Sequence, residues 1–543
     1  MEYKLLSSLT KVFADEAPQE EQVSLSILRG ETASFQVAVK DFAMVRLHAW
    51  ADGYKVTLRE VLQVPVTRPC NPGVDDDYLR KAPGLYPDAL RPVENPGRIT
   101  TVGWWKSVWI DAEPLENAAS DTEITVSLEV EEDGAYQNVA TLQVPVHLVN
   151  KQLPAQKLLQ TNWFHCDCLA DYYRVPVWSE EHWAIVENFL RSAARMGINL
   201  ILTPIFTPAL DTQVGGERTT NQLVDITCSG GEYSFGFEKL DRWVKLCLDC
   251  GMTHFEMAHL YSQWGSNRCP KIMATVDGVY RRIFGWETEG TSPEYAAFLA
   301  SFLPALAERL RQLGIADRCF FHIMDEPHIE HLDCYLQQKG QAAPYLQGFK
   351  MMDALSDFAF YQTGAVEVPV PATNSPDLEK FLAADMEQLW LYYCCSQGKD
   401  VSNRFIAMPS QRTRMLGVQL YTYKAAGFLQ WGFNFYNSRL SIRQIDPYAV
   451  TDSDEAFPAG DPFVVYPGEG GTALESLRYM NLRQAMHDLQ ALQLLESLAG
   501  REAVEKLIAE TAGGPVTLDV YPRDKEFLPA LRRKVNEAIE TYC

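Results

Sequence analysis

Basic residues are scarce in this sequence. Its 543 residues include 48 lysines and arginines against 71 aspartates and glutamates, which gives a formal net charge of −23. Such an excess of negative charge repels the phosphate backbone of nucleic acids and the anionic surface of membranes. We therefore expect no nucleic-acid partner and no membrane partner. A neutral ligand, such as a small glycan or glycoside, suits the chain better.

Long hydrophobic runs are also missing. No window approaches the roughly 18 apolar residues that a membrane-spanning helix requires. The N-terminal segment MEYKLLSSLTKVFADE has neither the sustained apolar core nor the small-residue cleavage site of a secretion signal. Twelve cysteines in a long chain without such a signal indicate reduced thiols. The sequence thus predicts a cytoplasmic protein, and it leaves homo-oligomer formation open.

Signatures of cofactor binding are few. Cys247 and Cys250 form the only C-x-x-C pair, and no second pair completes a zinc site. No glycine-rich phosphate fingerprint follows any expected strand. We therefore expect no cofactor and no metal. A metal hydrolase is kept as an alternative, because a strand end and one helical turn could gather several histidines and aspartates. These are His165, Asp167, His322, Asp325, His328 and His331.

Residues 1–152 are expected to fold as an antiparallel β-sandwich. Apolar and polar residues alternate over short segments such as 34–40 and 124–130, which is the period of half-buried strands. Helical periodicity is nearly absent, which favours a sandwich. Residues 70–97 interrupt the strands as a long polar loop. A loop of this length usually carries a function or packs against a neighbouring domain.

Between residues 153 and 470 strands alternate with amphipathic helices. The expected strands are 158–165, 198–206, 254–261, 319–325, 358–362, 388–394 and 427–435. Seven strands with helical crossovers predict a (β/α)8 TIM-like barrel in which one strand is hard to recognise. A doubly wound open sheet is the alternative. Residues 471–543 hold two further helices, about 473–498 and 525–541, so the expected fold is an α/β multidomain chain with a helical C-terminal extension packed on the barrel.

Polar and aromatic side chains gather at the ends of the expected strands. In a parallel barrel the active site forms at the carboxyl ends of the strands. Aromatic rings stack on the C–H faces of sugars, while carboxylates, amides and imidazoles bind hydroxyl groups. We therefore predict a sugar-binding pocket. Its expected substrate-binding residues are Trp163, His165, Asp167, Asp211, Arg218, His259, Tyr261, Trp264, His322, Trp390, Tyr392, Trp431 and Asn434.

The stretch FFHIMDEPH at 320–328 is the most informative one. Apolar residues lead into two consecutive carboxylates, Asp325 and Glu326, and Pro327 stops the strand. Where the pleat breaks, both carboxylates can turn into one pocket and take different pKa values, as glycoside hydrolysis requires. We predict them as the catalytic residues. Alternatively, Asp325 caps the next helix and Glu326 lies in its solvated first turn.

Several stretches resemble a known family. HIMDEPH, GLYPDALRP at 84–92, GFLQWGFNFYN at 427–437, and YPGEGG followed by SLRYMNLRQAMHDLQ are similar to the family called domain of unknown function 4091, which is related to glycoside hydrolase family 123. The resemblance runs from residue 84 to about 495. Where the last helix of the family tends to read arginine–aspartate–glycine, this chain has Arg483, Gln484 and Ala485.

The resemblance implies a β-N-acetylgalactosaminidase with substrate-assisted, retaining catalysis. By this analogy Asp325 orients the 2-acetamido group, whose carbonyl oxygen attacks the anomeric carbon. Glu326 first protonates the leaving oxygen and then activates water, and Tyr392 is a candidate donor to the acetamido oxygen. Because fold and chemistry can transfer between relatives while the sugar does not, this departure bears on the substrate rather than on the reaction.

Two further alternatives stay open. A retaining glycosidase of another sugar would use a protein carboxylate as nucleophile, and Asp211 or Glu367 could supply it. A glycan-binding protein without catalysis would show the same aromatic strand ends. It would not, however, need the carboxylate pair at 325 and 326.

Overall fold

The N-terminal part consists of two five-stranded sheets. The structure is a computed structural model that describes residues 1–543 except 133, 385 and 543. The first sheet has the order β1 (Glu2–Ser7), β3 (Ala33–Lys40), β8 (Lys106–Pro114), β5 (Tyr54–Val66) and β6 (Gly84–Val93). The second has the order β2 (Leu25–Arg29), β10 (Ala135–Gln152), β9 (Asp121–Glu132), β4 (Met44–Trp50) and β7 (Gly97–Thr100).

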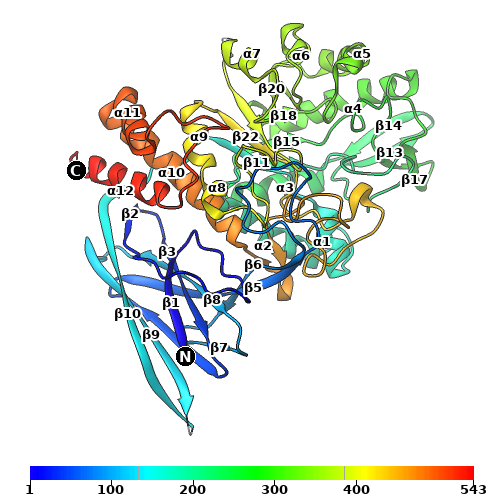
Figure 1. The fold of residues 1–543 in the computed structure, drawn as a ribbon. Helices are drawn as coiled ribbons and strands as arrows, with labels where there is room; N and C mark the ends of the chain where they lie inside the picture. The colour runs from blue at the N-terminus through cyan, green and yellow to red at the C-terminus, as the bar shows by residue number, and fades with distance from the viewer. Residues whose placement is uncertain (133, 385, 543) are drawn as a thin grey trace.

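The two sheets share one hydrophobic core. Alternate residues of β3 and β9, among them Val37, Val39, Val126 and Leu128, are buried in it together. This follows from strand geometry, which places every second side chain on the same face. The expected antiparallel pairing holds for every ladder of these sheets except one, because β2 pairs parallel with β10. Figure 1 shows these strands at the bottom of the molecule, below the α/β part.

The polar segment 70–97 differs from the expected loop. Its second half contains the strand β6, which pairs with β5 from Leu58 to Val66, with a register shift between Leu62 and Gln63. β6 lies at the edge of its sheet and contacts the C-terminal half of the chain. There Asp88 forms a fully buried ion pair with Arg478 at 2.7 Å, and Leu90 donates its backbone N–H to Glu475. The expectation that the segment packs against a neighbouring part of the chain agrees with these contacts.

The central part alternates strands and helices. Its parallel strands are β11 (Leu159–Asn162), β12 (Leu200–Thr203), β15 (His254–Met257), β18 (Cys319–Phe321), β19 (Lys350–Ala354), β20 (Val368–Val370), β21 (Trp390–Tyr392) and β22 (Gly427–Gln430). They form a five-stranded sheet β12-β15-β18-β19-β20 and a three-stranded sheet β11-β22-β21. One parallel bridge, Ala372 to Tyr392, joins β20 to β21. At the opposite edges of the two sheets, the backbone N–H of Asn199, just before β12, donates to the carbonyl oxygen of Gln160 in β11.

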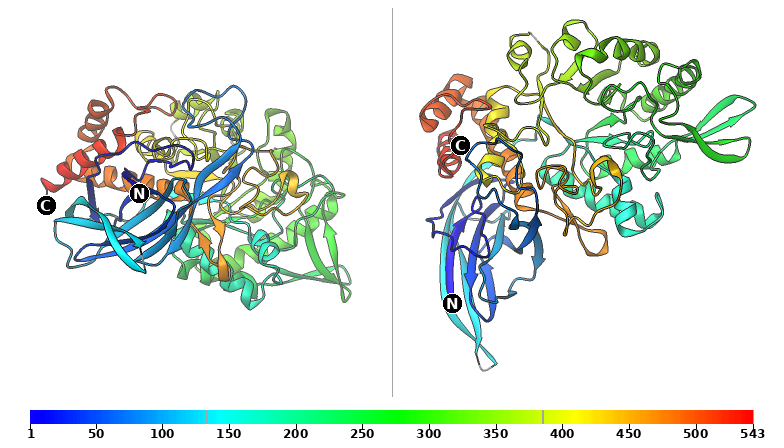
Figure 2. Two further views of the ribbon diagram at one scale, coloured as in Figure 1. Left: turned by 60° about the horizontal axis from the view of Figure 1, so that its bottom comes forward. Right: turned by 45° about the vertical axis from the view of Figure 1, so that its right-hand side comes forward.

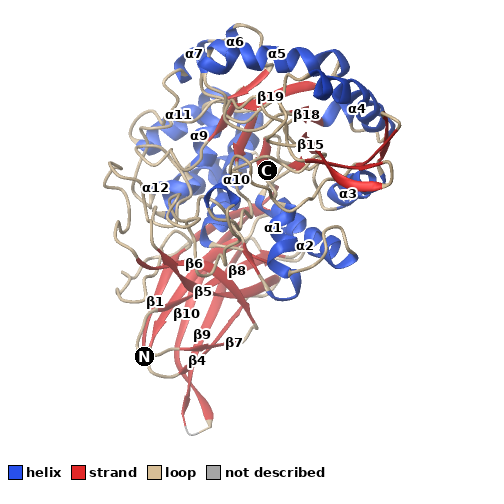
Figure 3. Cartoon of the chain, turned by 90° about the vertical axis from the view of Figure 1, so that its right-hand side faces the viewer, coloured by secondary structure: helices blue, strands red, loops and turns tan. Residues whose placement is uncertain are grey.

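Helices follow most of these strands on their outer side. They are α1 (Cys166–Tyr173), α2 (Glu180–Met196), α3 (Glu238–Asp249), α4 (Pro293–Gln312), α5 (Leu332–Ala342), α6 (Ala359–Gln362), α7 (Leu378–Ala383), α8 (Ser410–Arg414) and α9 (Leu416–Thr422). Figure 3 shows α4 to α7 along the top of the molecule, above β15, β18 and β19. A small sheet of β13 (Asp225–Ser229), β14 (Glu232–Gly236), β16 (Ile272–Val276) and β17 (Val279–Phe284) projects from this part (Figure 2).

One expected strand was wrong, and two of the eight parallel strands were missed, as was the small sheet of β13, β14, β16 and β17. Residues 358–362 were expected as a strand because of their aromatic content, but Ala359–Gln362 form the helix α6. Phe360 packs edge-on against Tyr335 of α5, with 5.3 Å between the ring centres. The strands on either side of α6 are β19 and β20, which are short and begin with lysine or contain proline.

The C-terminal residues form three helices rather than two. These are α10 (Leu477–Ala499), α11 (Arg501–Ala512) and α12 (Phe527–Glu540). α10 is mostly buried and contacts the sandwich through Arg478. Lys11, near the N-terminus, donates from Nζ to the carbonyl oxygens of Ile406 and Met408, at 2.8 Å each. Within the described residues, no helix combines the length and the hydrophobicity that crossing a bilayer requires.

Candidate active site

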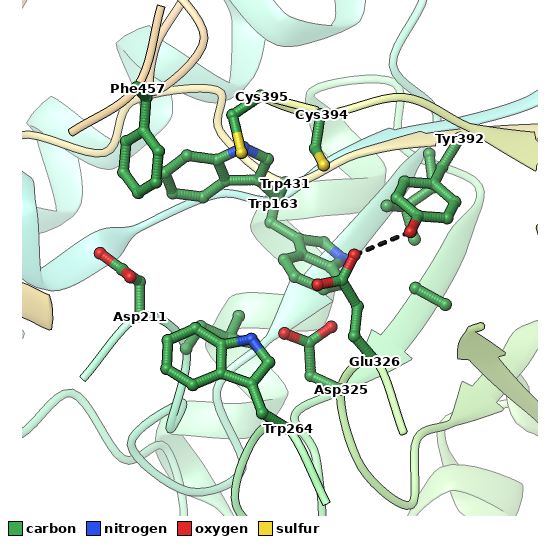
Figure 4. A pocket seen from close by; sticks show the side chains of 13 residues that line it. Trp163, Asp211, Trp264, Asp325, Glu326, Tyr392, Cys394, Cys395, Trp431 and Phe457 are labelled. Atoms are coloured by element: carbon green, nitrogen blue, oxygen red, sulfur yellow. Dashed lines mark hydrogen bonds between the residues drawn. The ribbon is translucent and has the colours of Figure 1, made fainter. Parts of the chain in front are cut away.

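A pocket of about 110 Å³ lies at the carboxyl ends of the parallel strands. Its position is the one at which parallel α/β folds build active sites, because loops from several strands converge there. The side chains that line it are drawn in Figure 4. They are Trp163, Leu210, Asp211, Trp264, Asp325, Glu326, Ala354, Tyr392, Cys394, Cys395, Leu429, Trp431 and Phe457.

Asp325 and Glu326 lie side by side on one wall of this pocket (Figure 4). Neighbouring residues of a regular strand point to opposite faces, but β18 ends at Phe321 and Glu326 has a left-handed backbone with φ of 45°. The backbone N–H of Glu326 donates to Ala354, and the carbonyl of Asp325 accepts from the N–H of Trp264 at 2.8 Å. These bonds fix the turn that brings both carboxyl groups into one cavity. The backbone strain at Glu326 is typical of functional sites.

The Asp325 carboxyl group is buried and unpartnered. The residue is 8% exposed, and within the described residues its side-chain oxygens accept no hydrogen bond. Burial and the neighbouring charge of Glu326 raise the pKa of Asp325 well above its ordinary value, against the opposing charge of His322. A buried carboxyl group without a donor is costly to the fold. It is therefore ready to accept a hydrogen bond from a ligand.

Glu326 differs from Asp325 in having a donor. The hydroxyl of Tyr392 donates to Oε1 of Glu326 at 2.8 Å (Figure 4). Burial raises the pKa of Glu326, while the Tyr392 hydrogen bond and the His328 charge lower it. Because the two carboxyl groups repel each other, the pair resists double ionisation and holds one proton over a wide pH range. Tyr392 contacts the Glu326 side of the pair, so it holds this carboxyl group.

Tryptophan side chains form much of the remaining wall. The indole nitrogen of Trp163 donates to Glu256 at 3.1 Å, and that of Trp431 donates to Asp461 at 2.8 Å. Trp264 is 43% exposed and has a positive φ of 54°. Because two of the three indole nitrogens are already bonded, those rings are fixed and present their apolar surface to the cavity. Fixed aromatic surfaces of this kind suit the C–H faces of a sugar ring.

A buried polar network lies beneath the pocket. His322 bonds through Nε2 to Glu256 at 2.9 Å and through Nδ1 to Asp353 at 3.2 Å, and Tyr335 donates to Asp353 at 2.6 Å. Burial alone would lower the pKa of His322, but the hydrogen bonds with both carboxylates raise it to about 9. The imidazolium thus balances the buried acids. Through Glu256 it also holds Trp163 in place.

This network argues against the metal alternative. Among the described residues, His259, His322 and Asp353 bring potential ligand atoms within 4.8 Å of one another. However, both nitrogens of His322 are bonded to carboxylates, and an imidazolium has no free lone pair for a metal. The set considered from sequence does not come together either, since His328 is exposed and Arg218 lies between His165 and Asp167. A guanidinium at that point repels a cation.

Three predicted binding residues form a structural cluster behind the pocket. Arg218 donates to Asp167 at 2.7 Å and lies 3.0 Å from Nδ1 of His165. His165 also contacts the carbonyl oxygen of Trp431, and burial together with the Arg218 charge lowers its pKa to about 3. All three side chains are buried and none lines the pocket. The structure does not place them in the pocket as expected, because their polar atoms are used within the chain.

Some of the other predicted binding residues line the pocket and some do not. Trp163, Asp211, Trp264, Tyr392 and Trp431 line the pocket together with Asp325 and Glu326. Five do not line it, because they bond or pack within the protein; these are His259, Tyr261, His322, Trp390 and Asn434. For example, the hydroxyl of Tyr261 donates to Gln341, the amide of Asn434 donates to the backbone of His165, and Trp390 packs against Gly427.

The sequence interpretation missed six residues that line the pocket, which are Leu210, Ala354, Leu429, Cys394, Cys395 and Phe457. Cys394 and Cys395 follow β21, which ends at Tyr392, and both residues line the cavity (Figure 4). Phe457 comes from a segment without helix or strand, and its ring packs edge-on against Trp431, with 5.3 Å between the ring centres. No local pattern in the sequence marks this phenylalanine. The two cysteines could have been found from their place directly after a strand.

The two carboxylates considered as protein nucleophiles lie in different places. Glu367 is exposed, outside the pocket, and pairs with Lys339 at 3.0 Å. Asp211 lines the pocket, away from Glu326 and next to Trp264 (Figure 4). Its Oδ2 accepts the backbone N–H of Leu440 at 2.8 Å, and burial raises its pKa to about 6. Asp211 therefore remains available to contact a ligand, whereas Glu367 does not.

A carboxyl pair with raised pKa values, set among aromatic walls at the ends of parallel strands, is the arrangement of a glycoside hydrolase. Residues 163–495, more than half of the chain, match the family described as "Glycoside hydrolase 123, catalytic domain". The chain belongs to this family, and it is a glycosidase. A comparison with curated proteins gave no match.

Solved structures agree with this family at the level of the fold. A family 123 glycoside hydrolase from Clostridium perfringens, studied for glycolipid glycan hydrolysis, aligns over 99% of this chain and 97% of its own, with a TM-score of 0.73 and 14% identity. Two other glycosidases align with TM-scores too low to support an argument. A family 5 mannosidase from Rhizomucor miehei aligns over 65% of this chain and 95% of its own, with a TM-score of 0.31 and 10% identity. A family 20 exo-β-N-acetylglucosaminidase from Vibrio harveyi aligns over 93% of this chain and 98% of its own, with a TM-score of 0.28 and 8% identity.

Proposed function

We propose that the enzyme removes a terminal 2-acetamido sugar, preferably β-linked N-acetylgalactosamine, by substrate-assisted catalysis with retention of configuration. The observation that carries this proposal is the unpartnered, buried Asp325 carboxyl group beside Glu326. An acetamido N–H would supply the hydrogen bond that Asp325 lacks. A hydrogen bond to the ionised form of Asp325 lowers its pKa, and the shared proton then resides on Glu326.

The residues of the pair then act in two steps. In the first step Glu326 gives its proton to the glycosidic oxygen. The acetamido carbonyl oxygen attacks the anomeric carbon, and the bond to the leaving group breaks. Asp325 orients the acetamido group and balances the positive charge that develops on it. In the second step Glu326 takes a proton from water, whose oxygen attacks the anomeric carbon and opens the ring of the oxazoline-like intermediate.

A protein nucleophile is the second candidate mechanism, and the position of Asp211 in the pocket favours it. Two carboxylates on opposite faces of a sugar are what that mechanism requires. Against it, Asp325 and Glu326 share one wall, and Asp211 already accepts a backbone hydrogen bond. The raised pKa of Asp211, about 6, also makes it a weak nucleophile at acidic pH.

The proposal is tested with a panel of chromogenic β-glycosides that differ only at carbon 2. We expect hydrolysis of the 2-acetamido galactoside and gluco-analogue and, because the nucleophile belongs to the substrate, a rate at least about 10³-fold lower for the 2-hydroxy galactoside. A thiazoline mimic of the oxazoline should inhibit competitively. Equal rates with and without the acetamido group, together with no inhibition, would instead favour the protein nucleophile.

Replacing Tyr392 with phenylalanine should move the alkaline limit of activity to higher pH. The Tyr392 hydroxyl stabilises ionised Glu326, so its removal raises the pKa of the acid and keeps Glu326 protonated at higher pH. A hydrogen bond to a charged group is worth about 1.5–3 kcal/mol, so a shift of about one pH unit is expected. The pH profile of kcat/KM measures it. The exposed Tyr280, replaced in the same way, is the control and should leave the profile unchanged. If the alkaline limit of the kcat/KM profile does not move, Tyr392 does not set the pKa of Glu326.

We also propose that the eight parallel strands close into the (β/α)8 barrel that the sequence predicts. The pairings within the two parallel sheets, the Ala372–Tyr392 bridge and the contact between β11 and β12 support the order β11, β12, β15, β18, β19, β20, β21, β22 and back to β11. The proposed domain limits are 1–152 for the sandwich, 153–470 for the barrel and 471–543 for the helical extension.

A further inference from the structure

A second cavity adjoins the pocket. It has a volume of about 610 Å³, several times that of the pocket, and it shares four lining residues with it. These are Glu326, Tyr392, Cys394 and Cys395. The rest of its wall comes from the loops that follow β18, β19, β20 and β21, so it opens at the same end of the strands. We call this second cavity the leaving-group groove.

The position of Glu326 between the two cavities indicates what the groove holds. An acid that protonates the glycosidic oxygen must lie at the bond between the terminal sugar and its leaving group. Asp325 lines only the pocket, whereas Glu326 lines both cavities. If Asp325 holds the acetamido sugar in the pocket, the bond to be broken lies at the junction. The next part of the substrate then lies in the groove.

The side chains of the groove define the chemistry of this part. Its polar members are His328, Ser356, Asp357, Asn374, Ser375, Asp377, Ser396 and Gln397. Gln397 donates to Oδ1 of Asn374 at 2.8 Å and accepts from the backbone N–H of Cys394 at 2.8 Å. This chain of bonds fixes the Asn374 amide on the exposed rim. Within the described residues its nitrogen donates no hydrogen bond, so it can donate to a ligand.

We propose that the leaving-group groove binds at least one further sugar residue of a glycan, with the Asn374 amide as a donor to its hydroxyl or ring oxygens. This inference rests on the proposed function, because it takes the terminal sugar to lie in the pocket. The free N–H groups of the Asn374 amide can donate to the hydroxyl or ring oxygens of a sugar, whereas a lipid tail lying over them would leave them without a partner. The natural substrate is therefore an oligosaccharide whose second residue contributes to recognition.

The test compares two substrates with the same terminal 2-acetamido sugar. One is a disaccharide, and the other is the β-glycosyl azide, whose three-atom leaving group does not extend along the groove. Asn374→Ala should lower kcat/KM for the disaccharide about fivefold to tenfold, the value of one hydrogen bond, and Asn374→Trp should lower it further by blocking the groove. Both variants should retain kcat/KM for the azide within about twofold.

Controls separate this inference from the proposed function. Gln347 is an exposed amide just before the amino end of β19, outside both cavities. Gln347→Ala should leave kcat/KM unchanged for both substrates. Because Asn374 is exposed, its variants should fold, with a melting temperature lowered by no more than several degrees through loss of the hydrogen bond from Gln397. If Asn374→Trp slows both substrates equally, or neither, the groove does not bind the leaving group, although the proposed function stands. If the wild-type enzyme cleaves neither substrate, the proposed function fails, and the assignment of the groove fails with it.

Discussion

Glu326→Gln is expected to lower kcat on an unactivated disaccharide by about 10³-fold, with little change in KM. Glutamine has the shape of glutamic acid but cannot give a proton to the glycosidic oxygen. The loss should be much smaller for a 2,4-dinitrophenyl glycoside, because that leaving group departs without protonation. Hydrolysis of the intermediate in the second step, however, still needs a base to activate water. Added azide needs no base, so it should restore turnover and give the β-glycosyl azide.

The measurement is steady-state kinetics on both substrates, with the azide product identified by NMR. Glu330→Gln is the matched control, because Glu330 is exposed, lies four residues further along the same loop and lines neither cavity. It should retain wild-type rates. A uniform loss on both substrates without rescue by azide would mean that Glu326 is not the acid/base and that another group carries the proton.

Asp325→Asn is expected to reduce kcat on 2-acetamido substrates by about 10²–10³-fold while making the protein more stable at neutral pH. The amide cannot balance the positive charge that develops on the acetamido group, which lowers the rate. The gain in stability has a different cause. The folded-state pKa of Asp325 is raised above its unfolded value, so ionising this carboxyl group costs folding free energy. Removing the charge should add about 1 kcal/mol to the free energy of unfolding at pH 7.5.

The sign of the pH dependence provides a second test of Asp325. For a carboxyl group with a raised folded-state pKa, the folded state binds more protons than the unfolded state, and wild-type stability rises as the pH falls. The stability difference between Asp325→Asn and wild type should therefore be larger at pH 8 than at pH 5. Chemical denaturation at both pH values measures it, with the exposed Asp52→Asn as the control. A variant that is inactive and also less stable would assign Asp325 a structural role instead.

Much of the site could be predicted from the sequence because it follows strand ends. Asp325 and Glu326 come directly after an apolar stretch that proline terminates, and Trp163, Tyr392 and Trp431 follow or end other strands. Which residue beyond a strand faces the cavity depends on backbone turns that the pattern does not encode. His165 lies two residues after Trp163 but turns behind the pocket, where it contacts Arg218.

The errors in the fold have similar physical causes. Short buried strands carry little periodicity, so β19 and β20 were missed, and the aromatic residues at 358–362 were mistaken for a strand although they form a helical turn. Phe457 was not predictable, because its segment has neither helix nor strand and only the tertiary fold brings it to Trp431. The two sheets at the N-terminus were easier, since alternation persists over long strands such as β9 and β10.

The buried ion pair between Asp88 and Arg478 has a consequence for how the chain acquires its structure. Each charge is shielded from water and has its partner in a different part of the chain. A buried charge that loses its partner destabilises a protein by about 3–5 kcal/mol. A catalytic part separated from the sandwich would carry an uncompensated guanidinium in helix α10. The stability of each part therefore depends on the other, and the two parts should unfold together in a single cooperative transition.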